Sequence, residues 1–165
     1  ETAQIAVQAS LTGHLVLSTL HTNTAVGAIS RLTDMKVEPF LFASSLLGVL
    51  AQRLVRKLCV HCKQEVEASS SDKERFTITD TAATSIWHAV GCTKCNDTGY
   101  AGRTGIYELL TVDEQLREMI HNGQGEPEIV KYVRQHTPSM REYGYTLVLQ
   151  GVTTLEEVLR VTRED

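Results

Sequence analysis

The sequence predicts an α/β protein that carries a small metal-binding insertion and ends in helices. Three observations lead to this prediction. The first 34 residues alternate between helical spacing and a short apolar run that suits a strand. All four cysteines fall into two CxxC pairs between Cys59 and Cys95, and four short stretches with helical spacing follow Leu109. We expect three parts, at residues 1–58, 59–108 and 109–165.

The N-terminal part has the rhythm helix, strand, helix. Residues 1–12 carry apolar side chains at helical spacing, and Gly13 can adopt the left-handed conformation that ends a helix. The apolar run from Leu15 to Leu20 is typical of a buried strand in a parallel sheet. A second helix is predicted from Ala25 to Asp34, with Asn23 or a neighbouring threonine as its cap.

A long helix is predicted from Pro39 to the basic cluster Arg53, Arg56 and Lys57. Cations near a helix C-terminus interact favourably with the helix dipole, which is one explanation of this cluster. The alternative is that Arg53 or Arg56 reaches a phosphate or a neighbouring subunit.

The strongest pattern is the pair of cysteine turns. Cys59 and Cys62 form the first, and Cys92 and Cys95 follow after 29 residues. Two such turns supply the four thiolates that tetrahedral Zn²⁺ prefers, and a site closed by four sulfurs can only be structural. The alternatives are unrelated buried thiols, disulfides in a secreted protein, and a thioredoxin-like pair, which would leave the second CxxC unexplained. His61 or His88 could replace one cysteine.

The stretches beside the second cysteine pair lack a clear period. Residues 67–84 are rich in Ser, Thr, Asp and Glu, which predicts a mobile excursion. Residues 91–105 contain the second pair followed by Gly99, Gly102 and Gly105, which predicts turns, with phosphate binding as the weaker reading.

From Leu109 onward, helices are predicted at residues 112–121, 127–136, 139–150 and 154–161, the last beginning with a capping box of Thr154 and Glu157. We expect these four helices to form one small bundle.

Charge and hydropathy exclude two classes of function. Lys and Arg total 16 against 20 Asp and Glu, a net charge of −4, which argues against a surface built for nucleic acid. The longest apolar run, from Pro39 to Ala51, is shorter than the roughly 17–25 residues of a membrane helix. The chain begins without Met and is expected to be a fragment.

Two histidines bracket the predicted strand. His21 lies at its carboxyl end, where ligands collect in open α/β sheets, and His14 lies at the opposite end. Each is either a ligand contact or an ordinary exposed or hydrogen-bonded histidine. No GxxxxGK[ST] loop occurs in the chain, so nucleotide binding in the usual way is not expected of it alone.

Several motifs resemble one family. The run from Thr12 to Ala25 reads TGHLVLSTLHTNTA and looks like the histidine box of secretion-traffic ATPases. The runs QRLVRKLC at residues 52–59, GRTGIYE at 102–108 and TLEEV at 154–158, together with the two CxxC pairs, resemble type II secretion ATPases. The resemblance covers the whole chain and is loosest from Asp113 to Tyr145.

The resemblance implies the second half of a RecA-like P-loop ATPase core, a zinc-binding tetracysteine subdomain and a C-terminal helical subdomain. It implies a hexameric cytoplasmic motor, peripheral to the bacterial inner membrane, that uses ATP and Mg²⁺ to drive pseudopilus assembly and protein export. His14 and His21 are then the candidates for sensing the γ-phosphate, and Cys59, Cys62, Cys92 and Cys95 are the zinc ligands. The family's P-loop and catalytic glutamate are expected upstream of residue 1, so the fragment alone should be inactive.

The implied partners are other copies of the motor and inner-membrane platform proteins, without nucleic acid and without a membrane span of its own. Type IV pilus extension motors share the tetracysteine element and retraction motors generally lack it, so an assembly motor is indicated. The alternatives are a type IV pilus assembly ATPase and a non-enzymatic, zinc-stabilised docking module.

Overall fold

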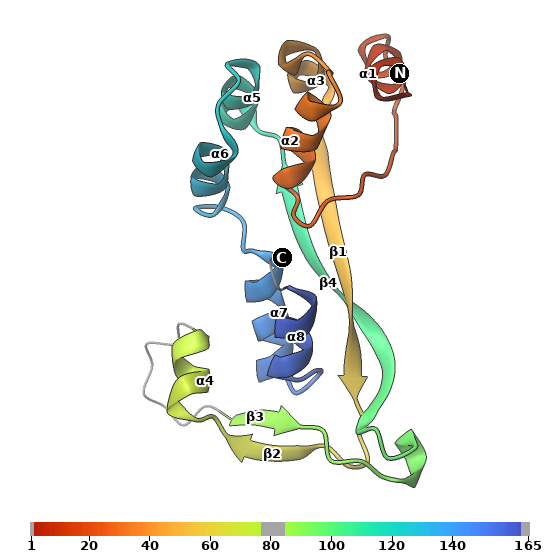
Figure 1. Ribbon diagram of the computed structural model, residues 1–165, viewed down its shortest axis with the longest axis vertical. Coiled ribbons are helices and arrows are strands. Elements are labelled where there is room, and N and C mark those ends of the chain that lie inside the picture. The colour runs from red at the N-terminus through yellow and green to blue at the C-terminus, as the bar shows by residue number, and fades with distance from the viewer. Residues whose placement is uncertain (1, 77–84, 163–165) are drawn as a thin grey trace. The chain divides into compact units, whose positions relative to one another are not determined.

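The computed structural model describes residues 2–76 and 85–162, which divide into two compact units. The first unit contains residues 1–51 and 108–138, and the second contains residues 52–107 and 139–165. Figure 1 shows the elements. Two long strands, β1 (Gly48–Leu58) and β4 (Tyr100–Thr111), pair in a two-stranded sheet, and each strand passes from one unit into the other. The helices expected to form one C-terminal bundle divide between the units.

Five helices build the first unit: α1 (Thr2–Leu11), α2 (Gly27–Asp34), α3 (Pro39–Ser45), α5 (Glu114–His121) and α6 (Glu126–Val133). Helix α3 packs on α1 and α5, and α6 packs on α2 and α5. Their buried apolar side chains form one core that includes Val26, Ile29, Phe42, Leu116 and Ile129. The predicted helices at residues 1–12, 25–34, 112–121 and 127–136 are therefore confirmed, with small shifts at their ends.

The second unit contains helices and a small antiparallel sheet whose two strands are separated in sequence by α4. Strands β2 (Gln64–Glu67) and β3 (Ser85–His88) pair antiparallel, with Val66 opposite Ile86. Helix α7 (Met140–Leu149) packs on α8 (Leu155–Val161) and on β3. Helix α4 (Ser70–Arg75) adds Phe76, whose ring meets that of Tyr145 edge-on at 5.0 Å. The helices predicted at residues 139–150 and 154–161 are confirmed.

The strand predicted from Leu15 to Leu20 is wrong. Residues 14–22 form neither helix nor strand, and the side chains of Leu15 and Leu17 are 76% and 88% exposed. A strand exists only where neighbours accept its backbone hydrogen bonds. The described strands pair only with one another, β1 with β4 and β2 with β3, so this run has no pairing partner among them.

The long helix predicted from Pro39 to Lys57 is also wrong beyond Ser45. Leu46 is extended, and the chain enters β1, along which exposure alternates from Gly48 to Val55. A Cβ atom at Gly48 would lie 2.8 Å from the carbonyl oxygen of Leu110, so the two strands approach closely at this glycine. Pairing with β4 decides between helix and strand here. The basic cluster consequently lies on a strand, and the helix-dipole explanation for it does not hold.

Two further expectations need correction. The acidic, Ser-rich stretch begins at the last residue of β2 and contains α4, which starts with a capping box in which Ser69 and Asp72 exchange hydrogen bonds. Residues 77–84 of that stretch lie outside the described residues. The glycines at 102 and 105 belong to β4 and not to a turn-rich loop, although Gly102 has a φ of +75°.

In the part of the chain that the structure describes, no helix has the length and apolarity of a bilayer span.

Candidate metal centre

The first cysteine turn follows directly from the end of β1. Cys59 accepts hydrogen bonds at its carbonyl oxygen from the N–H groups of Cys62, at 3.3 Å, and Lys63, at 3.0 Å. This tight turn keeps the Sγ atoms of Cys59 and Cys62 within 4.8 Å of each other. The N–H of Cys59 also donates to the carbonyl of Gly99 at 2.9 Å, which joins this turn to the segment after the second cysteine pair.

The second cysteine turn depends on unusual backbone conformations. The N–H groups of Cys95 and Asp97 both donate to the carbonyl of Cys92, at 3.0 and 2.9 Å. Asn96 and Asp97 have φ values of 52° and 57°, the left-handed region that asparagine and aspartate enter more readily than most residues. Gly91 has a φ of 111°, and a Cβ atom there would lie 2.7 Å from the Asp97 carbonyl oxygen. Glycine is therefore required at this position.

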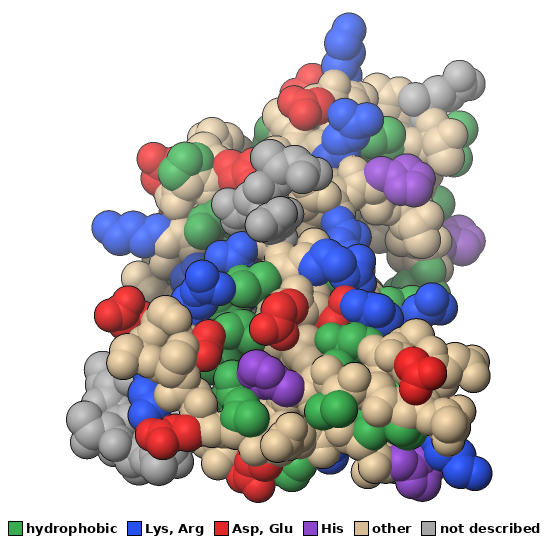
Figure 2. All heavy atoms as spheres, turned by 60° about the horizontal axis from the view of Figure 1, so that its bottom comes forward, with side chains coloured by type: hydrophobic (Ala, Val, Ile, Leu, Met, Phe, Trp, Pro, Cys, Tyr) green, Lys and Arg blue, Asp and Glu red, His purple; other side chains and the backbone are tan. Residues whose placement is uncertain are grey.

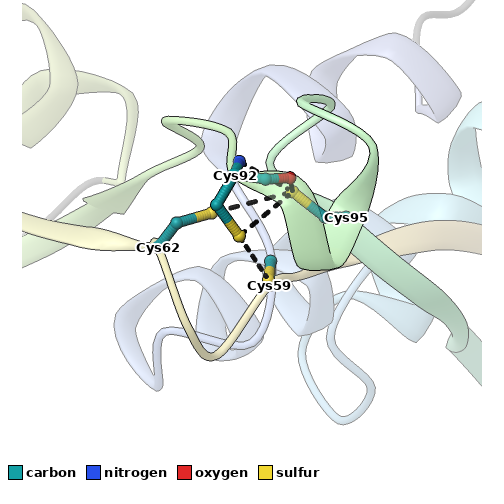
Figure 3. Close-up of side chains that lie close together, drawn as sticks. All are labelled: Cys59, Cys62, Cys92 and Cys95. Carbon is teal, nitrogen blue, oxygen red and sulfur yellow. Dashed lines mark hydrogen bonds between the residues drawn. The ribbon is translucent and has the colours of Figure 1, made fainter.

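The two turns bring all four sulfur atoms together. Figure 3 shows the four side chains pointing toward one another from two loops that are distant in sequence. The four Sγ atoms lie within 4.8 Å of one another. Cys62 and Cys95 are 3.8 Å apart, Cys92 and Cys95 are 3.8 Å apart, and Cys59 and Cys92 are 4.0 Å apart. Sulfurs at about 2.3 Å from one tetrahedral Zn²⁺ would be separated by about 3.8 Å, so the cluster has the size of a Zn–Cys₄ site.

Backbone N–H groups favour the thiolate form of Cys95. Although burial raises the pKa of the Cys95 thiol, the N–H groups of Cys92 and Gly99, each 3.2 Å from its sulfur, lower the pKa to about 7. Burial raises the pKa of the Cys62 thiol to about 12. Because a metal ligand must be a thiolate, the N–H groups around Cys95 support coordination, and a cation would be needed to deprotonate Cys62 at neutral pH.

The described residues of the second unit support the cysteine turns from several sides. The Lys63 ammonium donates to the carbonyl of Gly151 at 2.8 Å and lies 4.3 Å from the centre of the Trp87 ring. The N–H of Leu58 donates to the carbonyl of Val152 at 2.9 Å. These contacts tie both ends of the first turn to the loop between α7 and α8.

A family model described as type II/IV secretion system protein matches residues 1–160 of the chain. The chain belongs to this family. It is 60% identical over 164 residues to the type II secretion system ATPase E of Vibrio cholerae, covering 99% of this chain and 33% of that protein. It is 58% identical over 165 residues to the type II secretion system protein E of Aeromonas hydrophila, covering 100% of this chain and 33% of that protein. The chain thus spans about a third of the length of the curated relatives it matches.

Solved structures support the same grouping of this type II/IV secretion chain. The pilus retraction motor PilT with bound ADP aligns with a TM-score of 0.65 and 25% identity, over 99% of this chain and 36% of that one. The Legionella pneumophila ATPase DotB aligns with a TM-score of 0.63 and 18% identity, over 97% of this chain and 35% of that one. At this identity the match shows only that the folds are similar. Together these matches group the chain with secretion and pilus ATPases of α/β fold.

The predicted site residues of this family member fall into two separate places. The four cysteines converge, as the spacing predicted, whereas His61 and His88 are exposed and do not belong to the cluster. His14 and His21 are exposed at the ends of the segment between α1 and α2. The Nδ1 atom of His14 lies 3.2 Å from the Thr12 hydroxyl and 3.2 Å from the Ala9 carbonyl. The roles assigned to these two histidines stay predictions.

Sequence reasoning missed two buried carboxylates. Glu108 and Glu157 are each 2% exposed, and each pairs with arginine: Glu108 with Arg134, and Glu157 with Arg56 and Arg160. One of the two hydrogen bonds of the predicted α8 capping box is present: the Thr154 hydroxyl accepts from the N–H of Glu157. The Glu157 carboxylate pairs with Arg56 and Arg160 instead. The only available signal was that both glutamates stand inside the GRTGIYE and TLEEV motifs.

Proposed function

We propose that this chain is the C-terminal part of a cytoplasmic ATPase that powers pseudopilus assembly and protein export in bacterial type II secretion. The observation that carries the proposal is the 60% identity, over almost the whole chain, to a protein described as a type II secretion system ATPase. The likeness to PilT, a pilus retraction motor solved with bound ADP, supports a nucleotide-binding motor as the parent protein. We propose that this chain forms the second half of its RecA-like core.

In the proposed whole protein, ATP and Mg²⁺ are held by a P-loop outside these residues, in a hexamer of identical copies. His14 and His21 are proposed to sense the γ-phosphate and to couple it to movement between subunits. Both stand on an exposed segment, where a nucleotide or a neighbouring subunit can reach them. In phosphoryl transfer such groups act by positioning and charge stabilisation and do not form covalent intermediates.

We propose zinc as the ion for the four cysteines. The chemistry and spacing of the donor set support it: four sulfurs, separated by 3.8–4.0 Å in the measured pairs, suit tetrahedral Zn²⁺. When bound to four thiolates, zinc supplies structural stabilisation and has no open position for water. Cys59 and Cys62 would hold the end of β1 to the segment that carries Cys92 and Cys95.

The proposed location is the cytoplasmic face of the inner membrane, with platform proteins of the secretion system as partners. Nucleic acid is not proposed as a partner. Acidic and basic side chains are intermixed on the face seen in Figure 2, in keeping with the net charge of −4.

ATP turnover by the purified full-length protein tests the enzymatic part of the proposal. We expect Mg²⁺-dependent hydrolysis, and we expect His21→Ala to reduce kcat at least tenfold. His121→Ala, an exposed histidine in the last turn of α5, is the matched control and should hydrolyse ATP like wild type. Absence of hydrolysis by the wild-type protein, with export intact, would favour a non-enzymatic docking module instead.

A second candidate is a type IV pilus assembly ATPase, which the likeness to a pilus motor favours. Complementation of a strain that lacks the chromosomal gene distinguishes the two candidate functions. Restored export of a folded substrate by the plasmid-borne gene supports type II secretion, and restored pilus extension without export supports the pilus motor.

A further inference from the structure

A buried carboxylate on β4 reaches the segment that carries the histidines. Glu108 is 2% exposed and lies in the first unit. Its Oε1 accepts a hydrogen bond from the Arg134 guanidinium at 2.5 Å, and its Oε2 accepts one from the backbone N–H of Ala25 at 3.1 Å. Both oxygens of this carboxylate are therefore engaged, one by a charged side chain and one by the main chain.

Ala25 stands four residues after His21, where the exposed segment becomes buried. Ala25 and Val26 are fully buried, and the Thr24 hydroxyl accepts from the N–H of Gly27 at 3.0 Å at the start of α2. Upstream, no backbone hydrogen bond joins residues 15–21 to the rest of the described chain. The place of His21 therefore depends on how the chain is held immediately after it.

We propose that Glu108 is a positioning residue for His21, acting through the N–H of Ala25, with Arg134 holding the carboxylate in place. This inference rests on the proposed ATPase function. A carboxylate is required because it accepts at both oxygens. Glutamine has one acceptor oxygen and one NH₂ group, so either the Ala25 N–H or the Arg134 guanidinium would face a donor.

A buried ion pair such as Glu108–Arg134 can stabilise the fold without any role in catalysis. A second buried glutamate in the chain, Glu157, provides a matched control for this possibility. Glu157 is 2% exposed as well, pairs with Arg56 and Arg160, and accepts a backbone hydrogen bond from the N–H of Arg56 at 3.0 Å. It lies in the other unit, and within the described residues its hydrogen bonds join it to Arg56, Arg160 and Thr154. Glu157→Gln therefore imposes the same chemical change at an equal burial, in the unit that does not contain the histidine segment.

The experiment compares Glu108→Gln with Glu157→Gln in the full-length protein, at a temperature where both variants are folded. The two readouts are steady-state ATP hydrolysis and hydrogen exchange of peptides that cover residues 24–34, which include the Ala25 N–H bonded to Glu108 and helix α2. For Glu108→Gln we expect kcat to fall at least tenfold with KM for ATP within twofold of wild type, and exchange in these peptides to become at least tenfold faster. For Glu157→Gln we expect wild-type values of both.

The proposal is overturned if Glu108→Gln keeps wild-type kcat, or if both variants lose activity to the same extent. Should Glu108→Gln fail to fold, Arg134→Met replaces it, since that side chain is 28% exposed. This variant must also lower kcat and speed exchange in the same peptides, and wild-type behaviour would overturn the proposal. A wild-type protein that hydrolyses no ATP refutes the proposed function instead, while the exchange readout still tests the contact from Glu108 to Ala25.

Discussion

Arg56 on β1 donates both its backbone N–H and its guanidinium to the carboxylate of Glu157, which lies 101 residues later at the start of α8. The same guanidinium lies 4.1 Å from the centre of the Tyr100 ring, and the Tyr100 hydroxyl is 3.0 Å from that of Thr154. Residues of β1, β4 and α8 thus meet at one buried carboxylate, just before the first cysteine turn.

Removing the Glu157 carboxylate should destabilise the second unit. Glu157→Ala leaves the N–H of Arg56 without its acceptor, although the Arg56 and Arg160 side chains are half exposed and can return to water. We expect a loss of about 1–3 kcal/mol in the free energy of unfolding, measured by denaturant titration. The adjacent Glu156 is exposed, and Glu156→Ala should change this free energy by less than about 0.5 kcal/mol. Equal effects of the two substitutions would contradict the assigned role of the buried carboxylate.

The same carboxylate predicts a pH dependence of stability. Burial raises the pKa of Glu157, but the hydrogen bonds from Arg160 and Arg56 outweigh burial and lower it from the ordinary 4.5 to about 2. Because the pKa is lower in the folded than in the unfolded protein, the stabilisation is complete above pH about 4.5 and disappears as the pH falls toward 2.

Melting temperatures measured from pH 6 to pH 2 check this prediction. The difference between wild type and Glu157→Gln should be largest above pH about 4.5 and shrink below it. A difference that stays constant across this range would show that folding does not lower the pKa of this carboxyl.

Metal removal should unfold the region around the cysteines. Metal analysis of the purified protein should find one zinc per chain, and a strong chelator should remove it with loss of ordered structure between Cys59 and Gly99. Binding energies of such sites are on the order of 10–16 kcal/mol, comparable to the stability of a whole domain. Cys62→Ser should abolish stoichiometric zinc, whereas His61→Ala, at an exposed neighbour outside the cluster, should retain it. Full zinc content in Cys62→Ser would refute the four-sulfur site.

Gly151 should tolerate no side chain. Its φ is 66°, and a Cβ atom would lie 2.6 Å from Nε1 of Trp87. The Lys63 ammonium lies over the same Trp87 ring. Gly123 has the same φ with no atom within 4 Å of such a Cβ, so Gly123→Ala measures the conformational cost alone, about 1–2 kcal/mol. Gly151→Ala should cost at least about 1 kcal/mol more in the free energy of unfolding, because of the clash. Equal costs at the two positions would mean that the Trp87 ring moves aside freely.

Local sequence patterns were sufficient for much of the fold. Helices predicted from apolar spacing and stop signals are confirmed in both units, because an amphipathic period, a cap and a following glycine are encoded within a few residues. The convergence of the four sulfurs was predicted for a similar reason. A CxxC turn aims two thiols at one point whatever surrounds it, and two such turns leave one way to complete a tetrahedron.

Tertiary structure decided the rest. The apolar stretch after Ser45 suits a helix or a strand equally, and pairing with β4, made possible by the close approach at Gly48, selects the strand. The run from Leu15 to Leu20 has strand composition without a described strand to pair with, so it stays irregular.

The burial of these glutamates was invisible in the sequence because each has an arginine partner far away in the chain, although Glu157 also pairs with the nearby Arg160. Arg134 is 26 residues from Glu108, and Arg56 is 101 residues from Glu157. By itself, the sequence determined the family, most of the helices and the convergence of the four sulfurs, since each is recorded in short-range spacing. Only the tertiary structure decided which strands pair, how the helices divide between the two units and which carboxylates are buried, because these depend on contacts between residues that no local pattern relates.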